Sequence, residues 1–248
     1  MKNWKMTFKP LIVGMAIFIL LSGCATNNAE RHRERGYANM IKGDFDQAIV
    51  YFDQAILLDP NCAQSHISRG TVHLGLNNFD LAMADFNEAI RLDPSKVDAY
   101  LLRATIHLFH NDYDLAMADF NRALLLDPYN VDAYKLRGTL HMFQDDFDRA
   151  MADFNEAIRL DPNFAPAYIN RGIAFSKQAD FDRAIADLSE AIRLDPNNAN
   201  AFGHRAVAFF YQGNYDQAIS DFDTVLRLEP DNTSAIRWLE RIRQELGL

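Results

Sequence analysis

Apolar positions recur at helical spacing within blocks of 34 residues. Each block holds an alanine, a large apolar side chain four residues later, and a second small residue three residues after that. Positions three or four apart share one face of a helix, so every block contains a helix whose buried face alternates small and large. An earlier column of glycine or alanine predicts a second helix that approaches the first closely. The large positions are Phe52, Phe86, Phe120, Phe154, Leu188 and Phe222.

An acidic residue followed by proline closes each block. Proline cannot continue a helix and biases the residue before it away from helical geometry, so each pair marks a helix end. An unbroken period of this length predicts an all-α fold, a right-handed α-solenoid of stacked helix–turn–helix repeats. The pairs are Asp59-Pro60, Asp93-Pro94, Asp127-Pro128, Asp161-Pro162, Asp195-Pro196 and Glu229-Pro230.

This phase divides the chain into predicted segments. Six repeats span residues 29–232, and their internal turns are rich in Asp, Asn and Gly, which tolerate turn dihedrals. The last Asp of each turn is expected to cap the second helix or to lie at its positive end. Residues 233–248 have amphipathic spacing and are expected to form a capping helix over the last repeat.

An arginine precedes the small residue of every first helix, and repeats two to six carry an aspartate across the hairpin. Guanidinium and carboxylate groups match in geometry, so these columns predict a structural Arg–Asp ladder between paired helices, for example from Arg103 to Asp119. In repeat one, Tyr51 stands at the aspartate position. The alternative interpretation is an arginine stripe that binds anionic ligands.

The N-terminal segment differs from the repeats. Three lysines precede an apolar run over residues 11–21, which is too short for a typical membrane span and fits the core of a signal peptide. The run closes on Leu21-Ser22-Gly23-Cys24. This tetrapeptide resembles the lipobox of bacterial lipoproteins, in which the leader is cleaved before a cysteine that carries a diacylglyceryl group. The resemblance implies a cleaved leader (1–23) and a lipidated Cys24; an ordinary signal peptide or an uncleaved anchor is the alternative.

A lipidated Cys24 would place the repeats close to a membrane, because residues 24–28 form only a short tether. The protein is then expected on the periplasmic face of the outer membrane in a bacterium with two membranes, and otherwise on the outer face of the cytoplasmic membrane. Cys62 is the second cysteine. If Cys24 is acylated, no internal disulfide can form, and Cys62 is interpreted as a small buried hydrophobe.

The repeat columns resemble the tetratricopeptide repeat (TPR) family over about residues 29–232. The matching features are the small residue after arginine, the aromatic residue at the turn, the small–large–small second helix and the closing Asp-Pro. In TPR proteins the first helices line a concave groove for peptides or partner helices, which implies a partner-binding groove here. The residues carried over to that groove are Leu74, Leu101, Leu108, Phe109, Met142, Phe143, Phe210 and Tyr211.

The expected ligand is an apolar or amphipathic protein segment. Adjacent apolar pairs such as Leu108-Phe109 widen the apolar face beyond one core stripe, and surplus apolar area often marks a partner site. The Lys and Asn pattern with which some TPR domains hold a C-terminal carboxylate is missing. Packing of these residues between neighbouring repeats is the alternative.

The net charge and the lack of catalytic motifs argue against two further classes of function. The net charge of −9 argues against nucleic-acid binding, which needs a basic face. No phosphate loop, nucleophile elbow or cysteine-pair metal motif occurs, so no enzyme activity and no cofactor is expected. His73, His107 and His141 lie one repeat apart, too far for all three to ligate one ion, and are interpreted as packing residues.

These observations predict a membrane-anchored scaffold that binds another exported protein. Two alternatives stay open: a self-associating structural lipoprotein, and an accessory subunit of an envelope-assembly or wall-modifying enzyme. The sequence names no partner.

Overall fold

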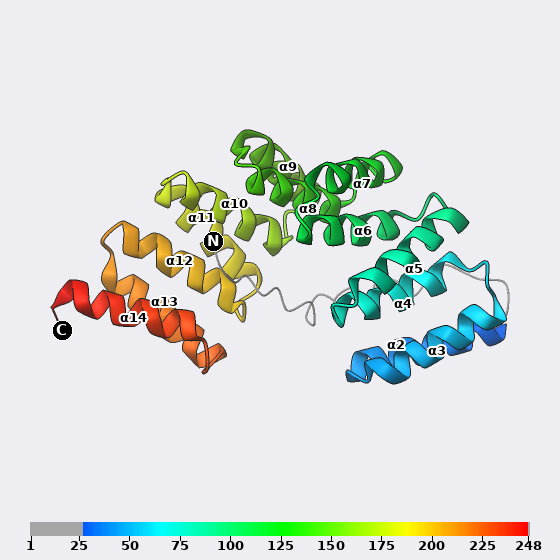
Figure 1. Ribbon diagram of the computed structural model, residues 1–248. Helices are drawn as coiled ribbons and strands as arrows, with labels where there is room; N and C mark the ends of the chain where they lie inside the picture. Colours follow the sequence, from blue (N-terminus) through cyan, green and yellow to red (C-terminus); the bar gives the residue numbers. More distant parts are fainter. Residues whose placement is uncertain (1–26, 248) are drawn as a thin grey trace. The chain divides into compact units, whose positions relative to one another are not determined.

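The computed structural model describes residues 27–247, which are helical except for short connections (Figure 1). Thirteen α-helices and no strand occur in this range, so the all-α solenoid class predicted from the repeats is confirmed. The chain separates into two compact units at residue 128. The leader, the lipobox and Cys24 lie outside the described residues.

The first unit contains three helical hairpins. In each one a first helix and a second helix lie side by side, and within this unit the second helices of the first two hairpins also contact the first helix of the next hairpin (Figure 1). The helices are α2 (Asn27–Lys42), α3 (Phe45–Leu58), α4 (Ala63–Gly75), α5 (Phe79–Leu92), α6 (Val97–Phe109) and α7 (Tyr113–Leu126).

The second unit contains three more hairpins and one final helix. The last helix packs on the second helix of the last hairpin, the position expected for a cap. The helices are α8 (Val131–Phe143), α9 (Phe147–Leu160), α10 (Ala165–Lys177), α11 (Phe181–Leu194), α12 (Ala199–Tyr211), α13 (Tyr215–Leu228) and α14 (Thr233–Leu246).

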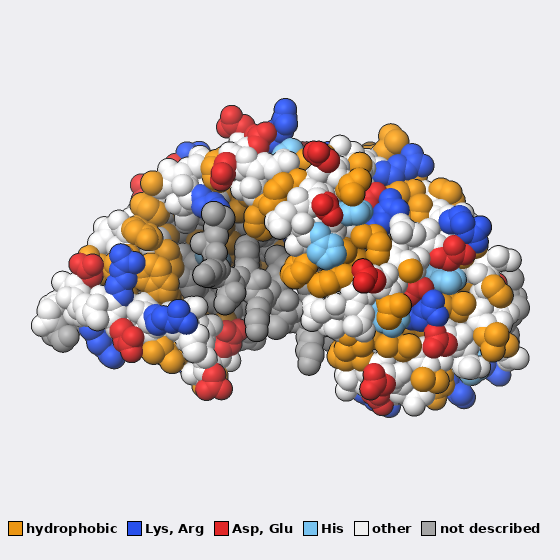
Figure 2. Space-filling view, viewed as in Figure 1, with side chains coloured by type: hydrophobic (Ala, Val, Ile, Leu, Met, Phe, Trp, Pro, Cys, Tyr) orange, Lys and Arg blue, Asp and Glu red, His pale blue; other side chains and the backbone are white. Residues whose placement is uncertain are grey.

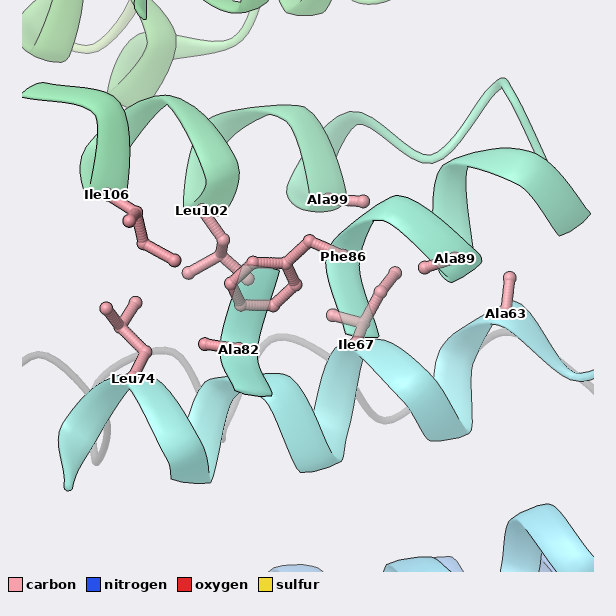
Figure 3. Close-up of a cluster of buried hydrophobic side chains, with 9 residues drawn as sticks. All are labelled: Ala63, Ile67, Leu74, Ala82, Phe86, Ala89, Ala99, Leu102 and Ile106. Atoms are coloured by element: carbon pink, nitrogen blue, oxygen red, sulfur yellow. The ribbon is translucent and has the colours of Figure 1, made fainter. Parts of the chain in front are cut away.

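The small–large–small pattern of the second helices forms the core. Phe86 of α5 is fully buried between Ala82 and Ala89, with Ile67 of α4 and Leu102 of α6 around its ring (Figure 3). The glycine column explains the close approach of the helices: a Cβ built at Gly70 would lie 2.7 Å from the Phe86 ring. The ring therefore occupies the space that a side chain at the glycine position would need.

The helices end and begin near the turn residues that the sequence predicts. The aspartate before each proline ends its helix, and the side chain of Asp93 accepts the backbone N–H of Ser95 at 3.0 Å. In α3, α9 and α11 the aspartate two positions before the last Asp of the turn caps the second helix. Asp146, for example, accepts the N–H of Arg149, while Asp148 lies in the first turn, the second of the two expected positions. Asp148 thus stabilises the positive end of the helix through its charge.

Cys62 precedes α4 and is buried. It is disulfide-bonded and so is not a free thiol, which corrects its interpretation as a simple buried hydrophobe. The guanidinium Nη1 of Arg33 lies 3.4 Å from the Cys62 sulfur. The other cysteine of the chain, Cys24, lies outside the described residues.

Candidate partner-binding surface

Two exposed aromatic side chains are held in place by a turn residue of the preceding repeat. Phe109, at the end of α6, is 45% exposed and lies 4.7 Å, centroid to centroid, from Phe79 at the start of α5. In the second unit, Tyr211 is 53% exposed and stacks on Phe181 with centroids 5.5 Å apart and ring planes 11° apart. A ring fixed in this way loses little conformational entropy when a partner covers it.

The residues predicted to line the groove divide into exposed and buried groups. Phe109, Phe143 and Tyr211 are exposed, and Leu108 is half-buried. Leu74 is buried and faces Ile106 in the core of the first unit (Figure 3). Met142 packs with Phe154, Phe210 packs in the last core cluster, and Leu101 is buried as well. The final residue of a first helix is thus available at three repeats, while the residue before it contributes mainly to packing.

A larger aromatic group lies where α12 meets α14. The Trp238 ring is stacked near Phe222 and meets Phe210 edge-on, with centroids 6.0 and 5.2 Å away respectively. Tyr211 lies edge-on to Trp238 at 6.2 Å, and the guanidinium carbon of Arg241 lies 5.2 Å from the indole centroid. Figure 2 shows hydrophobic side chains over these C-terminal helices with basic side chains beside them. Sequence reasoning missed this group, although Trp238 is the only tryptophan after the leader.

The Arg–Asp ladder predicted for repeats two to six is confirmed. In each, Nε and Nη2 of the arginine donate to the two carboxylate oxygens of the aspartate, as from Arg171 to Asp187 at 2.7 Å each. The hydrogen bonds to Asp119 raise the pKa of Arg103. The N–H groups of these guanidinium groups already donate to acceptors within the fold. They therefore do not support the alternative interpretation of an arginine stripe that binds anionic ligands.

The histidine column lies between the ladder and the turns, with His73 and His141 buried and His107 half-buried. His73 is 9% exposed, and burial lowers its pKa despite the nearby Asp85 carboxylate. Burial is also the main cause that lowers the pKa of His107 and the pKa of His141. Within residues 27–247, no three His, Cys, Asp or Glu side chains are grouped as metal ligands, and none of the helices described there is long and apolar enough to cross a membrane.

Comparison with known proteins identifies the repeats. A tetratricopeptide repeat model matches residues 34–97 and 169–233, and two further models of that family match residues 97–130 and 131–164. The chain belongs to the tetratricopeptide repeat family. TPR domains mediate protein–protein interactions and bind peptides. A comparison with curated proteins finds no matching relative.

Solved TPR structures are similar in fold at low sequence identity. The APC/C hetero-tetramer Cut9–Hcn1 gives a TM-score of 0.80 at 20% identity and covers 94% of this chain; the chain spans 46% of the matched one. PilW, described as a type IV pilus biogenesis factor, gives 0.78 at 18% identity over 87% of this chain and 100% of its own. YrrB, described as having an unusual peptide-binding site, gives 0.54 at 23% identity over 76% of this chain and 97% of its own.

Proposed function

We propose that this protein is a lipid-anchored TPR scaffold of the bacterial envelope that binds an apolar or amphipathic segment of another exported protein. The observation that carries the proposal is the set of half-exposed rings, Phe109 and Tyr211, each held by an aromatic turn residue of the neighbouring repeat. Exposed, positioned rings bind at a smaller entropic cost than flexible side chains.

The anchoring part of the proposal rests on the leader and Cys24. A diacylglyceryl thioether at Cys24 and the disulfide of Cys62 exclude each other within one chain, because the sequence has two cysteines. The proposal assigns the thioether to the lipidated mature protein. PilW, a chain that this one matches over its whole length, is described as a type IV pilus biogenesis factor, which supports an envelope role without identifying a partner.

Photocrosslinking in cells tests the partner-binding role. A photoreactive amino acid replaces Phe109, Phe143 or Tyr211, one at a time, in the full chain. We expect all three positions to give an adduct with the same protein. Leu57, which is 72% exposed on α3, supplies a matched control that should give no such adduct. Folded, exported protein with no specific adduct at any of the three positions would contradict the proposal.

Light scattering after size-exclusion chromatography separates the proposal from self-association. A monomer whose mass does not change with concentration is expected. Crosslinks from Tyr211 to a second copy of the same chain, together with a concentration-dependent dimer, would favour the structural lipoprotein instead.

A further inference from the structure

The flank of α14 that faces α12 combines aromatic and basic side chains. We define the C-terminal basic face as Arg237, Trp238 and Arg241 of α14 together with Tyr211 of α12. Arg237 and Arg241 are one helical turn apart on the same side, and both are exposed. The guanidinium carbon of Arg241 lies 4.9 Å from the Phe210 centroid and 5.2 Å from that of Trp238.

The arginines of this face have no carboxylate partner among residues 27–247, in contrast to the exposed arginines of three second helices. On α5, α9 and α11 an arginine of about two-thirds exposure pairs with a glutamate three residues before it. Those pairs are Glu88–Arg91, Glu156–Arg159 and Glu190–Arg193, with nitrogen–oxygen distances of 2.6 Å.

Glu240 is the acidic residue nearest in sequence to both arginines of this face. Glu240 follows Arg237 by three residues, so the acid lies on the C-terminal side of the base. The favourable order on a helix is the reverse, with the acid first. No ion pair joins Glu240 to Arg237 or to Arg241 within the described chain. In a protein with net charge −9, this face presents guanidinium N–H donors that the protein itself does not use.

Arg241 is also positioned, although it makes no ion pair. Its guanidinium lies beside the rings of Phe210 and Trp238, an arrangement that holds the plane of the group while its N–H edges stay available. A carboxylate next to an apolar side chain would match both parts of this face: the carboxylate accepts from the guanidinium, and the apolar group covers Trp238 and Tyr211.

We infer that the C-terminal basic face binds an amphipathic partner segment that carries carboxylates beside its apolar residues. This inference rests on the proposed function and specifies the charge of the partner. Charge complementarity favours this occupant, because two exposed guanidinium groups lie beside aromatic rings in a protein whose net charge is −9.

Fluorescence of Trp238 tests the inference in the full chain. Substitution of Trp4 by Phe leaves Trp238 as the only tryptophan. Three 16-residue amphipathic peptides share one stripe of Leu and Phe and carry Glu, Gln or Lys at the flanking positions. We expect the Glu peptide to shift the Trp238 emission and to bind about tenfold more tightly than the Lys peptide, with a difference that shrinks at high salt.

Charge reversal with a matched control gives the decisive comparison. R237E/R241E should reverse the order of the Glu and Lys peptides, whereas R243E should change either affinity by less than about twofold. Arg243 is a suitable control because it is an exposed arginine of the same helix on the opposite flank, also without an ion pair among residues 27–247. Circular dichroism confirms that each variant is folded.

The outcomes separate this inference from the proposed function. Equal binding of all three peptides that is lost in F143A or Y211A would overturn the charge assignment and leave the proposed function standing. An R243E effect as large as that of R237E/R241E would overturn it as well. Binding of none of the peptides would contradict both proposals. A Trp238 shift only with vesicles containing about one-third phosphatidylglycerol would overturn the inference and identify a membrane surface as the ligand. A dimer that R237E/R241E dissociates would overturn it and identify a second copy of the chain as the ligand.

Discussion

Arg103 makes a two-pronged ion pair with Asp119 while its third nitrogen binds the preceding repeat. Nε and Nη2 donate to the two Asp119 oxygens at 2.8 and 2.7 Å, and Nη1 donates to Oδ1 of Asn87 at 2.7 Å. Asp119 is buried, and Arg103 is only partly exposed. One side chain therefore joins both helices of its own hairpin to the hairpin before it.

Removing one partner of this ion pair should cost more free energy of unfolding than removing both partners together. We expect Asp119→Asn to lower the free energy of unfolding by about 3 kcal/mol or more, because the Arg103 charge stays partly buried without its partner. A double-mutant cycle with Arg103→Leu should give a coupling of about 1 to 3 kcal/mol.

Urea unfolding followed by circular dichroism measures this coupling. The exposed pair Glu156–Arg159 is the matched control, and its cycle should give less than about 0.5 kcal/mol. A coupling between Arg103 and Asp119 no larger than that of the control would show that the ladder does not stabilise the fold.

The turns of the repeats place one residue in the left-handed region, and its identity should set a measurable stability difference. Ala179 has φ of 59°, where an alanine is strained, whereas Gly213 occupies the equivalent position with φ of 79°. We expect Ala179→Gly to stabilise the protein by about 0.5 to 1 kcal/mol and Gly213→Ala to destabilise it by about 1 kcal/mol. Asn77→Gly should be nearly neutral because asparagine tolerates this conformation. Thermal unfolding checks the signs, and a destabilising Ala179→Gly would contradict the strain argument.

The buried histidines should make stability sensitive to mild acid. Burial lowers the pKa of His141, opposed by Asp153 and Asp146 and assisted by Arg137 and Arg149. The unfolded state, with a histidine pKa of about 6.5, then binds more protons, so stability is lost as the pH falls below about 6.5.

Replacing His141 by phenylalanine tests this pH dependence, since Phe175 and Phe209 fill the same column in the last two repeats. The difference in free energy of unfolding between pH 7.5 and pH 5.5 should become smaller in His141→Phe. His110→Gln, at an exposed position, should leave that difference unchanged. An unaltered acid sensitivity in His141→Phe would rule out this histidine as its source.

Mass spectrometry of the membrane-bound protein tests the proposed anchor. We expect an N-terminal peptide that begins at Cys24 and carries a diacylglyceryl thioether. Cys24→Ser should retain the leader, while Cys62→Ser should be processed normally. A mature protein with Cys24 and Cys62 joined in a disulfide would contradict lipidation at Cys24.

The period of 34 residues was sufficient to predict the helices, the small and large core positions and the ladder, because every hairpin repeats the same columns of residues. The columns of Arg103 and Asp119 could be paired from the sequence for that reason. The binding surface was predicted less well. Phe210 and Met142 are exposed on a helical projection, but the neighbouring helices bury them, and the sequence does not specify how closely consecutive hairpins pack.

Contacts between repeats were missed for the same physical reason. The stacking of Tyr211 on Phe181 joins residues of consecutive repeats, and so does the third hydrogen bond of Arg69, Arg103, Arg171 and Arg205. The sequence shows that these residue types recur in successive repeats, but it does not show which residues of the next repeat they contact. The basic face of α14 was missed because that helix lies outside the repeat period, where comparison between repeats gives no information.

The spacing of the ladder has an evolutionary consequence. Arg103 binds residues 16 positions before and 16 positions after itself, and Arg171 and Arg205 do the same. Each arginine therefore finds both its partners within a single stretch of sequence shorter than one period. In-frame duplication or deletion of 34 residues would recreate every such contact at the new junction, so the gene can change its number of repeats in one recombination event without a compensating mutation.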